Sequence, residues 1–244
     1  MFKAKTDKIR GIASNKEKVI QELEKLLTGS VSIYIDVANV RPWSEKLKWH
    51  IDYKRLKQFL DSFGNVTDIK YYNGHFEEDS NSLNDINKIR EMGYTVRTKP
   101  IKIMRQSIDA TSIPISSDVL LSQFIRRALL RGYRGEVIEY LNKEFLSMNQ
   151  LGRFFIEDRK CNFDVEISVD AIKMIKHYDT FCIFSGDADF VYLNNFLRKK
   201  GKKVIIIKGG FITSKLRKSA NLVINAQKIK KHIAKIEQRP DKSG

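Results

Sequence analysis

The sequence has few of the residues that cross-link small folds or bind zinc. Among its 244 residues are two cysteines, Cys161 and Cys182, and four scattered histidines, which excludes a disulfide framework and a Cys/His zinc site. No apolar run approaches the roughly 20 residues that a membrane-spanning helix needs. The basic segment MFKAKTDKIR is not followed by the apolar stretch of a secretory signal. We therefore expect a cytoplasmic protein without a membrane partner.

Acidic residues are also scarce relative to basic ones. Asp and Glu number 29 against 45 Lys and Arg, which gives a formal net charge of +16. A folded protein this basic is usually attracted to a polyanion, and nucleic acid is the first candidate. A generally basic soluble surface is the alternative. Hydrophobic residues make up 42% of the chain, enough for one large domain or one domain with an insertion.

Apolar residues recur with strand and helix periods in alternation along most of the chain. The capping box at 14–17 predicts a helix that ends near Leu27. Further helices are predicted at 52–64, 83–93, 164–177 and 191–200, and strands at 31–36, 66–72, 95–99, 180–184, 203–208 and 222–224. Because right-handed crossovers place helices on both faces of a parallel sheet, this order predicts a three-layer α/β sandwich with a mainly parallel central sheet.

The alternation breaks at about 101–158, where a polar loop and two helices near 118–130 and 135–148 are predicted. We expect a helical extension at 1–29, a main domain at 30–226 that carries this helical insertion, and a basic tail at 227–244 with a disordered end. The insertion either walls a substrate groove or makes the contact of a homo-oligomer.

Aspartates follow the predicted strands, at the edge where parallel sheets carry their sites. Asp36 ends the first strand, Asp187 and Asp189 lie in the segment FSGDADF, and Asp164 opens a helix. Gathered carboxylates raise one another's pKa, so the cluster is tolerable when it holds divalent cations. Hard oxygen ligands suit Mg²⁺ or Mn²⁺. An aspartate at a helix start is usually an N-cap, which is the alternative for Asp164.

Signatures of other α/β classes are absent from the sequence. Ala38 occupies the place where a HAD-type phosphatase has its second aspartate. No Gly-x-Gly-x-x-Gly follows the first strand, and the chain has no Gly-x-x-x-x-Gly-Lys-Ser/Thr loop and no Gly-x-Ser-x-Gly elbow. These absences argue against dinucleotide binding, a phosphate-binding nucleotide loop and serine hydrolysis.

Three segments carry a family resemblance. They are YIDVANV at 34–40, DVEISVDAI at 164–172, and FSGDADF at 184–190 followed by LRKKGKKVIII. Together they resemble the NYN domain of the PIN-like nuclease superfamily, in its LabA-like branch. The resemblance covers roughly 30–100 and 159–226, and the insertion has no counterpart in it.

The resemblance implies a metal-dependent ribonuclease that hydrolyses RNA phosphodiesters to a 3′-hydroxyl and a 5′-phosphate with one or two Mg²⁺ or Mn²⁺ ions. It also implies the site residues. The metal-binding and catalytic set is Asp36, Asp164, Asp187 and Asp189, with Asn39, Ser185 and Asp170 in support. Two alternatives remain: an RNA-binding or scaffold protein without turnover, and a metal-dependent phosphatase acting on small phosphoesters. The intact carboxylate set speaks against the first, and the net charge against the second.

Two clusters of basic residues suggest where single-stranded or structured RNA would bind. The first comprises Arg41, Trp43, Lys46, Lys48 and Trp49, and the second comprises Arg126, Arg127 and Arg131 in the insertion. Aromatic rings stack on bases, and Lys and Arg hold phosphates. The alternatives are that the tryptophans cover the core and that the arginines form a solvated helix face.

Overall fold

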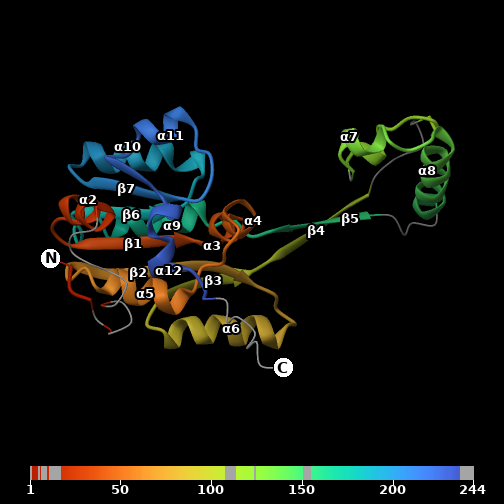
Figure 1. The fold of residues 1–244 in the computed structure, drawn as a ribbon. Coiled ribbons are helices and arrows are strands. Elements are labelled where there is room, and N and C mark those ends of the chain that lie inside the picture. Colours follow the sequence, from red (N-terminus) through yellow and green to blue (C-terminus); the bar gives the residue numbers. More distant parts are fainter. Residues whose placement is uncertain are drawn as a thin grey trace, which may run out of the picture. The chain divides into compact units, whose positions relative to one another are not determined.

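Two separately packed units make up the chain (Figure 1). The computed structural model describes residues 2–4, 6, 10, 18–107, 114–123, 125–150 and 155–236. Unit 1 consists of Met1–Pro100 and Cys161–Gly244, and unit 2 of Ile101–Lys160. The predicted capping box at 14–17 lies outside the described residues. Within those residues, no helix combines the length and the apolar character needed to cross a membrane.

Unit 1 is built on a six-stranded sheet in which all neighbouring strands run parallel. In spatial order the strands are β3 (Thr95–Pro100), β2 (Val66–His75), β1 (Val31–Asp36), β6 (Thr180–Phe184), β7 (Lys203–Lys208) and β8 (Leu222–Asn225). Helices cover both faces of this sheet, so the predicted α/β sandwich with a parallel central sheet is confirmed.

The central strands are buried on both faces, as their near-continuous apolar sequences predict. Every residue of β1 is buried, and successive side chains point to opposite faces. Val31, Ile33 and Ile35 pack in one apolar cluster, and Tyr34 packs in the other. Asp36 shares the face of Tyr34 because it lies two residues further along the strand.

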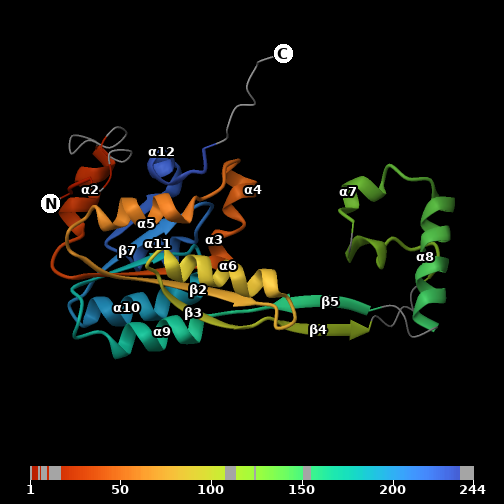
Figure 2. The same cartoon turned by 90° about the horizontal axis from the view of Figure 1, so that it is seen from below.

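Different helices cover the two faces of the sheet (Figure 2). The face of Ile33 and Ile35 packs against α2 (Lys18–Leu26), α5 (Tyr53–Asp61), α6 (Ser80–Glu91) and α12 (Lys230–Ile233). The face of Tyr34 packs against α9 (Asp164–Lys173), α10 (Val191–Lys199) and α11 (Ser214–Lys218). Two short helices, α3 (Val37–Val40) and α4 (Trp43–Leu47), follow β1.

The strand order reverses direction between β1 and β6, which are neighbours in the sheet although about 145 residues separate them. Ile35 pairs with Phe184 at the carboxyl ends of these two strands. The chain leaves β1 toward β2 and leaves β6 toward β7, so the two following loops diverge at this edge of the sheet. Ligands of open parallel sheets bind at such a switch point.

The segment that follows β8 packs onto unit 1. A 3₁₀ turn, Ala226–Ile229, leads into α12, where His232 and Ile233 are buried. The buried Arg55 on α5 donates to the carbonyls of Lys231 and Ala234. The lysine-rich sequence from Lys228 onward predicts a tail, but its apolar positions dock on α5 as far as the described residues extend.

Unit 2 contains strands as well as the predicted helices. β4 (Lys102–Ser107) pairs antiparallel with β5 (Phe155–Lys160). The helix predicted near 118–130 is instead a 3₁₀ turn, Leu121–Gln123, and a short helix, α7 (Arg127–Leu130). The second predicted helix is present as α8 (Gly135–Gln150). Its buried Asn142 donates to the carbonyls of Ile115 and Ser117, which fixes the preceding loop on the helix.

Candidate functional site

Asp36 lies at the switch point, where β1 ends and α3 begins. It caps α3, because its Oδ1 accepts from the Asn39 amide at 3.4 Å. Its Oδ2 accepts from Ser185 Oγ at 3.1 Å, across the sheet in the loop after β6. The side chain is buried. Both carboxylate oxygens are therefore held in place by neighbours from two strand ends.

The loop after β6 presents the next two aspartates. Asp187 accepts from the Asp189 amide at 3.0 Å and caps the 3₁₀ turn Ala188–Phe190. The Gly186 amide donates to Asn39 Oδ1 at 2.9 Å, which ties this loop to α3. Phe190 is buried beneath the turn, as its sequence position predicts. The hydrogen bonds of Asn39 and Ser185 thus hold α3 and the loop after β6 together.

Asp164 is the first residue of α9 but does not cap that helix. Phe163 occupies the N-cap position, which makes no side-chain hydrogen bond. Asp164 Oδ2 instead accepts from Asn162 Nδ2 at 2.7 Å. A merely capping role for Asp164 is therefore excluded, and its carboxylate is free to face the β6 loop.

Three of the four predicted aspartates converge. One carboxylate oxygen each from Asp164, Asp187 and Asp189 lies within 4.8 Å of the others. Asp36 lies beside this group, outside the 4.8 Å limit but close enough to feel its charge. Burial raises the pKa of Asp36 to about 6, a shift that Asp164 and Asp187 increase and the Ser185 and Asn39 hydrogen bonds oppose. Burial, then Asp187 and Asp189, also raise the pKa of Asp164.

The donor set fits a hard divalent cation. All three converging ligands are carboxylate oxygens, the type that Mg²⁺ and Mn²⁺ prefer. Two of them, Asp164 and Asp187, are partly buried, and Asp189 is exposed, so the site keeps an open side for water or a phosphate. Burial raises the pKa of Asp164 most, and the neighbouring Asp187 and Asp189 charges, which a cation would neutralise, raise it further.

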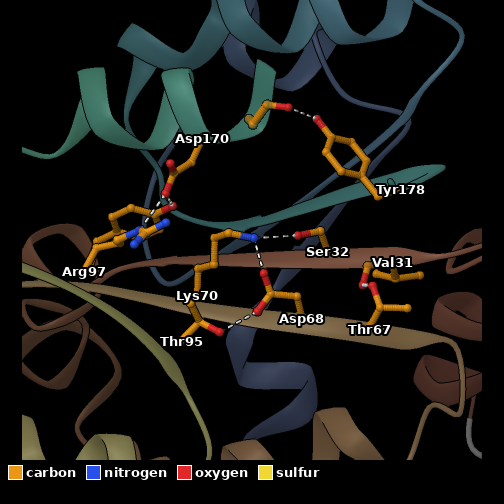
Figure 3. A network of polar contacts seen from close by, with 11 residues as sticks. Val31, Ser32, Thr67, Asp68, Lys70, Thr95, Arg97, Asp170 and Tyr178 are labelled. Carbon is orange, nitrogen blue, oxygen red and sulfur yellow. Dashed lines mark hydrogen bonds and ion pairs between the residues drawn. The ribbon is translucent and has the colours of Figure 1, made fainter. Parts of the chain in front are cut away.

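Asp170, predicted to support the aspartates, makes its contacts with β2 and β3 (Figure 3). Its Oδ2 accepts from Arg97 Nε at 3.0 Å and from the Tyr72 hydroxyl at 2.9 Å. One turn earlier on α9, Glu166 pairs with Lys99. These contacts fasten α9 to β2 and β3, and they fix the helix that begins with Asp164. Asp170 therefore positions the site through α9 and does not belong to the carboxylate cluster.

Both tryptophans are buried, which corrects their predicted role in stacking on RNA bases. Trp43 is 4% exposed and Trp49 is 7% exposed. Trp49 Nε1 donates to Gln227 Oε1 at 2.8 Å. Trp43 lies directly under Gly209, where an added Cβ would come within 2.2 Å of the indole. Both tryptophan rings are covered by segments more than 150 residues away in the sequence. The basic sequence around the tryptophans therefore does not reveal that they are buried.

The basic residues of both predicted clusters are exposed. Arg41, Lys46 and Lys48 lie in or next to α4 of unit 1, and Arg41 donates to Asn73 at 3.3 Å. The second cluster, Arg126, Arg127 and Arg131, is exposed on unit 2. A phosphate-binding role for these residues stays a prediction.

Phe211, a residue beside the site, belongs to none of the sequence motifs. Phe211 follows β7 at the same carboxyl edge and is 88% exposed, the largest fraction among the large hydrophobic residues of the described chain. It lines a small pocket together with Asn39 and Gly186. The available signal is its position, because an aromatic residue follows Gly209 and Gly210 directly after a buried strand.

The parallel sheet with aspartates at its switch point defines a PIN-like α/β protein. The NYN domain family model matches residues 30–128 and 108–227. The chain is 25% identical to the low amplitude and bright protein LabA of Synechococcus elongatus over 216 residues, 86% of this chain and 90% of that protein. A solved protein of unknown function from Vibrio parahaemolyticus shares the fold, with a TM-score of 0.54 at 18% identity over 85% of this chain and 97% of that chain.

The chain belongs to the NYN domain family, in its LabA-like branch. NYN domains form part of the PIN-like nuclease superfamily, so the predicted family is confirmed. This membership connects the chain to nucleic-acid chemistry in general terms.

Proposed function

We propose that the protein is a metal-dependent ribonuclease. The observation that carries the proposal is the convergence of the Asp164, Asp187 and Asp189 carboxylates at the switch point of an NYN domain. Asp36, held beside them by Ser185 and Asn39, completes the acidic set. A divalent cation explains why a fold would gather these charges in one place.

In the proposed site, Asp164, Asp187 and Asp189 hold Mg²⁺ or Mn²⁺. The bound cation would lower the pKa of a water molecule and stabilise charge on the scissile phosphate. Asp36 would ionise fully next to the cation, because a nearby positive charge favours the carboxylate form. Hydrogen bonds from Ser185 and Asn39 fix the position of the Asp36 carboxylate relative to the β6 loop.

The reaction class is hydrolysis of a phosphodiester. Water adds to the phosphorus atom, the bond to one ester oxygen breaks, and the products are an alcohol and a phosphate monoester. The family resemblance assigns them as a 3′-hydroxyl and a 5′-phosphate. The net charge of +16 favours a polymeric anion over a small phosphoester, because each Lys or Arg that meets a phosphate adds to affinity.

Asp187→Asn tests the proposal. The change preserves size and the ability to accept from the Asp189 amide but removes one negative charge from the cation site. We expect RNA cleavage in Mg²⁺ or Mn²⁺ to fall by at least about a hundredfold, the scale of losing one catalytic interaction. RNA binding at low salt should survive, since phosphate contacts supply it.

Asp85→Asn is the matched control. Asp85 is an exposed aspartate on α6 that pairs with Lys88, and its loss should leave cleavage unchanged. Normal cleavage by Asp187→Asn, or wild-type cleavage that persists in excess EDTA, would refute the metal-nuclease proposal. RNA binding without any cleavage by the wild type would favour a binding protein, and hydrolysis of a chromogenic phosphoester alone would favour a phosphatase.

A further inference from the structure

A pocket of about 280 Å³ adjoins the aspartate site. Asn39 and Gly186, the two residues whose hydrogen bond joins the β1 and β6 loops, form its inner wall. Lys46 from α4 and Phe211 from the loop after β7 also line the pocket. Its volume is at the small end of ligand pockets, a size suited to one unit of a longer ligand.

The Phe211 ring is exposed although its loop is firmly packed. On one side, Lys208 Nζ donates to the Gly210 carbonyl at 2.5 Å. On the other side, Ile212 is 4% exposed and lies under Gly186, where an added Cβ would approach it to 3.4 Å. Because both neighbours are fixed, the 88% exposure of Phe211 is set by the fold and not by a loose loop.

A lysine that lines the same pocket supplies a positive charge. Lys46 is exposed and lies over Gly210, so close that a Cβ there would be 3.2 Å from Lys46 Cδ. Within the described part of the chain, no carboxylate lies within ion-pairing distance of Lys46. The buried Trp43 forms the floor between α4 and the β7 loop.

We propose that this pocket binds one nucleotide of single-stranded RNA, with the base stacked on Phe211 and a neighbouring phosphate held by Lys46. An exposed aromatic ring paired with a free cation is the arrangement that binds single strands without base readout. The proposal rests on the proposed function, since it places the nucleotide next to the scissile phosphate. The net charge of +16 favours this occupant over a protein with a neutral or basic surface.

RNA binding in EDTA tests the proposal without cleavage. A fluorescently labelled single-stranded RNA octamer is titrated with the wild type, Phe211→Ala and Phe211→Trp. We expect Phe211→Ala to weaken binding about tenfold, within the range of one base–aromatic stack, and Phe211→Trp to restore it. The salt dependence should be the same for all three proteins because no charge changes.

Two further measurements separate stacking from phosphate contact. Lys46→Gln should weaken binding and lower the salt slope by about 0.7, the value for one phosphate contact on a single strand. In Phe211→Trp, the new tryptophan is exposed whereas Trp43 and Trp49 are buried. We therefore expect saturating RNA to quench its fluorescence, relative to the wild type.

Tyr140→Ala is the control, because it removes another exposed ring, 61% exposed on α8 of unit 2. Wild-type affinity in Phe211→Ala, or an equal loss in Tyr140→Ala, would overturn the proposal. So would a change of oligomeric state in Phe211→Ala with unchanged RNA affinity, which would make Phe211 a protein contact. If RNA binding behaves as expected but Mg²⁺-dependent cleavage is absent, the pocket assignment stands and the nuclease proposal fails.

Discussion

At the scale of single residues, the burial of Asp36 predicts that the stability of the protein depends on pH. Burial raises its pKa to about 6 in the folded protein, whereas an aspartate in an unfolded chain ionises near pH 3.9. The folded state therefore binds the proton more tightly. The stability of the metal-free protein should fall as the pH rises from about 4 to about 6, and it stays lower above that window.

Asp36→Asn should remove this penalty. The shift in pKa corresponds to at most about 3 kcal/mol, so the metal-free variant should melt at a higher temperature than the wild type at pH 7.5. The difference should vanish near pH 4, where the wild-type carboxyl is protonated. Thermal unfolding followed by circular dichroism in EDTA measures the melting temperatures of both proteins at pH 7.5 and near pH 4, with Asp85→Asn as the control. Equal melting temperatures at pH 7.5 would contradict the raised pKa of Asp36 in the folded protein.

Residue-scale prediction from the sequence succeeds where a side chain is placed by its own strand or turn. Asp36, Asp187 and Phe190 are placed by the ends of buried strands, which local apolar patterns reveal. Trp43 could not be placed in this way, because the loop at Gly209 that covers it is remote in sequence. Phe211 was missed for a related reason: its position after Gly209 and Gly210 is a local signal, but the exposure of its ring depends on how remote segments pack.

At the scale of elements, a buried lysine on β2 faces α9. Lys70 is 3% exposed and pairs with Asp68, and its Nζ also lies 3.4 Å from Ser32 Oγ and 4.9 Å from the Tyr34 ring centre (Figure 3). Removing one partner of such a pair leaves a buried charge uncompensated, which costs more than the pair itself contributes.

Asp68→Ala should therefore destabilise the protein by up to about 3 kcal/mol, the lower end for breaking a buried pair because Asp68 is partly exposed. Adding Lys70→Met should recover most of the loss, since methionine fills the space without a charge. Urea denaturation of the single and double variants measures the recovery. Asp85→Ala, which breaks an exposed pair, should cost less than about 1 kcal/mol. A double variant less stable than Asp68→Ala would exclude this account.

Element prediction was reliable for the strands of the parallel sheet and poor in unit 2 and after β8. The central strands β1, β6 and β7 follow from apolar runs such as VIII in β7, which a core strand accommodates. β4 and β5 were missed because their pairing gives a two-stranded ribbon with exposed residues such as Ile103 and Met104, without the alternation of a half-buried strand. α12 was missed because lysines surround its buried positions, His232 and Ile233.

At the scale of the whole molecule, the chain leaves unit 1 after Pro100 and returns to it at Cys161, and these two points are adjacent. Cys161 Sγ lies 3.9 Å from the Lys99 carbonyl oxygen and 4.0 Å from that of Pro100. The two chain ends that remain after removal of Ile101–Lys160 are therefore adjacent. A linker of about four residues, a common loop length, should join them.

We expect the protein with Ile101–Lys160 replaced by such a linker to fold and to melt cooperatively, because both apolar clusters belong to unit 1. Because its arginines are exposed, unit 2 should contribute to RNA affinity or to the oligomeric state. Circular dichroism, light scattering and RNA titration measure the three properties. A truncated protein that keeps wild-type affinity and oligomeric state would show that unit 2 has neither predicted role, and one that fails to fold would show that unit 1 depends on it.

The docking of α12 on α5 has a consequence for synthesis on the ribosome. Arg55 finds its two carbonyl partners 176 and 179 residues further along the chain, and domains form as their sequence emerges from the N-terminal side. Until the α12 segment has been synthesised, the Arg55 guanidinium lacks its two carbonyl partners and the apolar surface around Phe59 stays exposed. Unit 1 therefore completes its core late in translation, so the nascent chain is an expected client of chaperones that shield apolar surface.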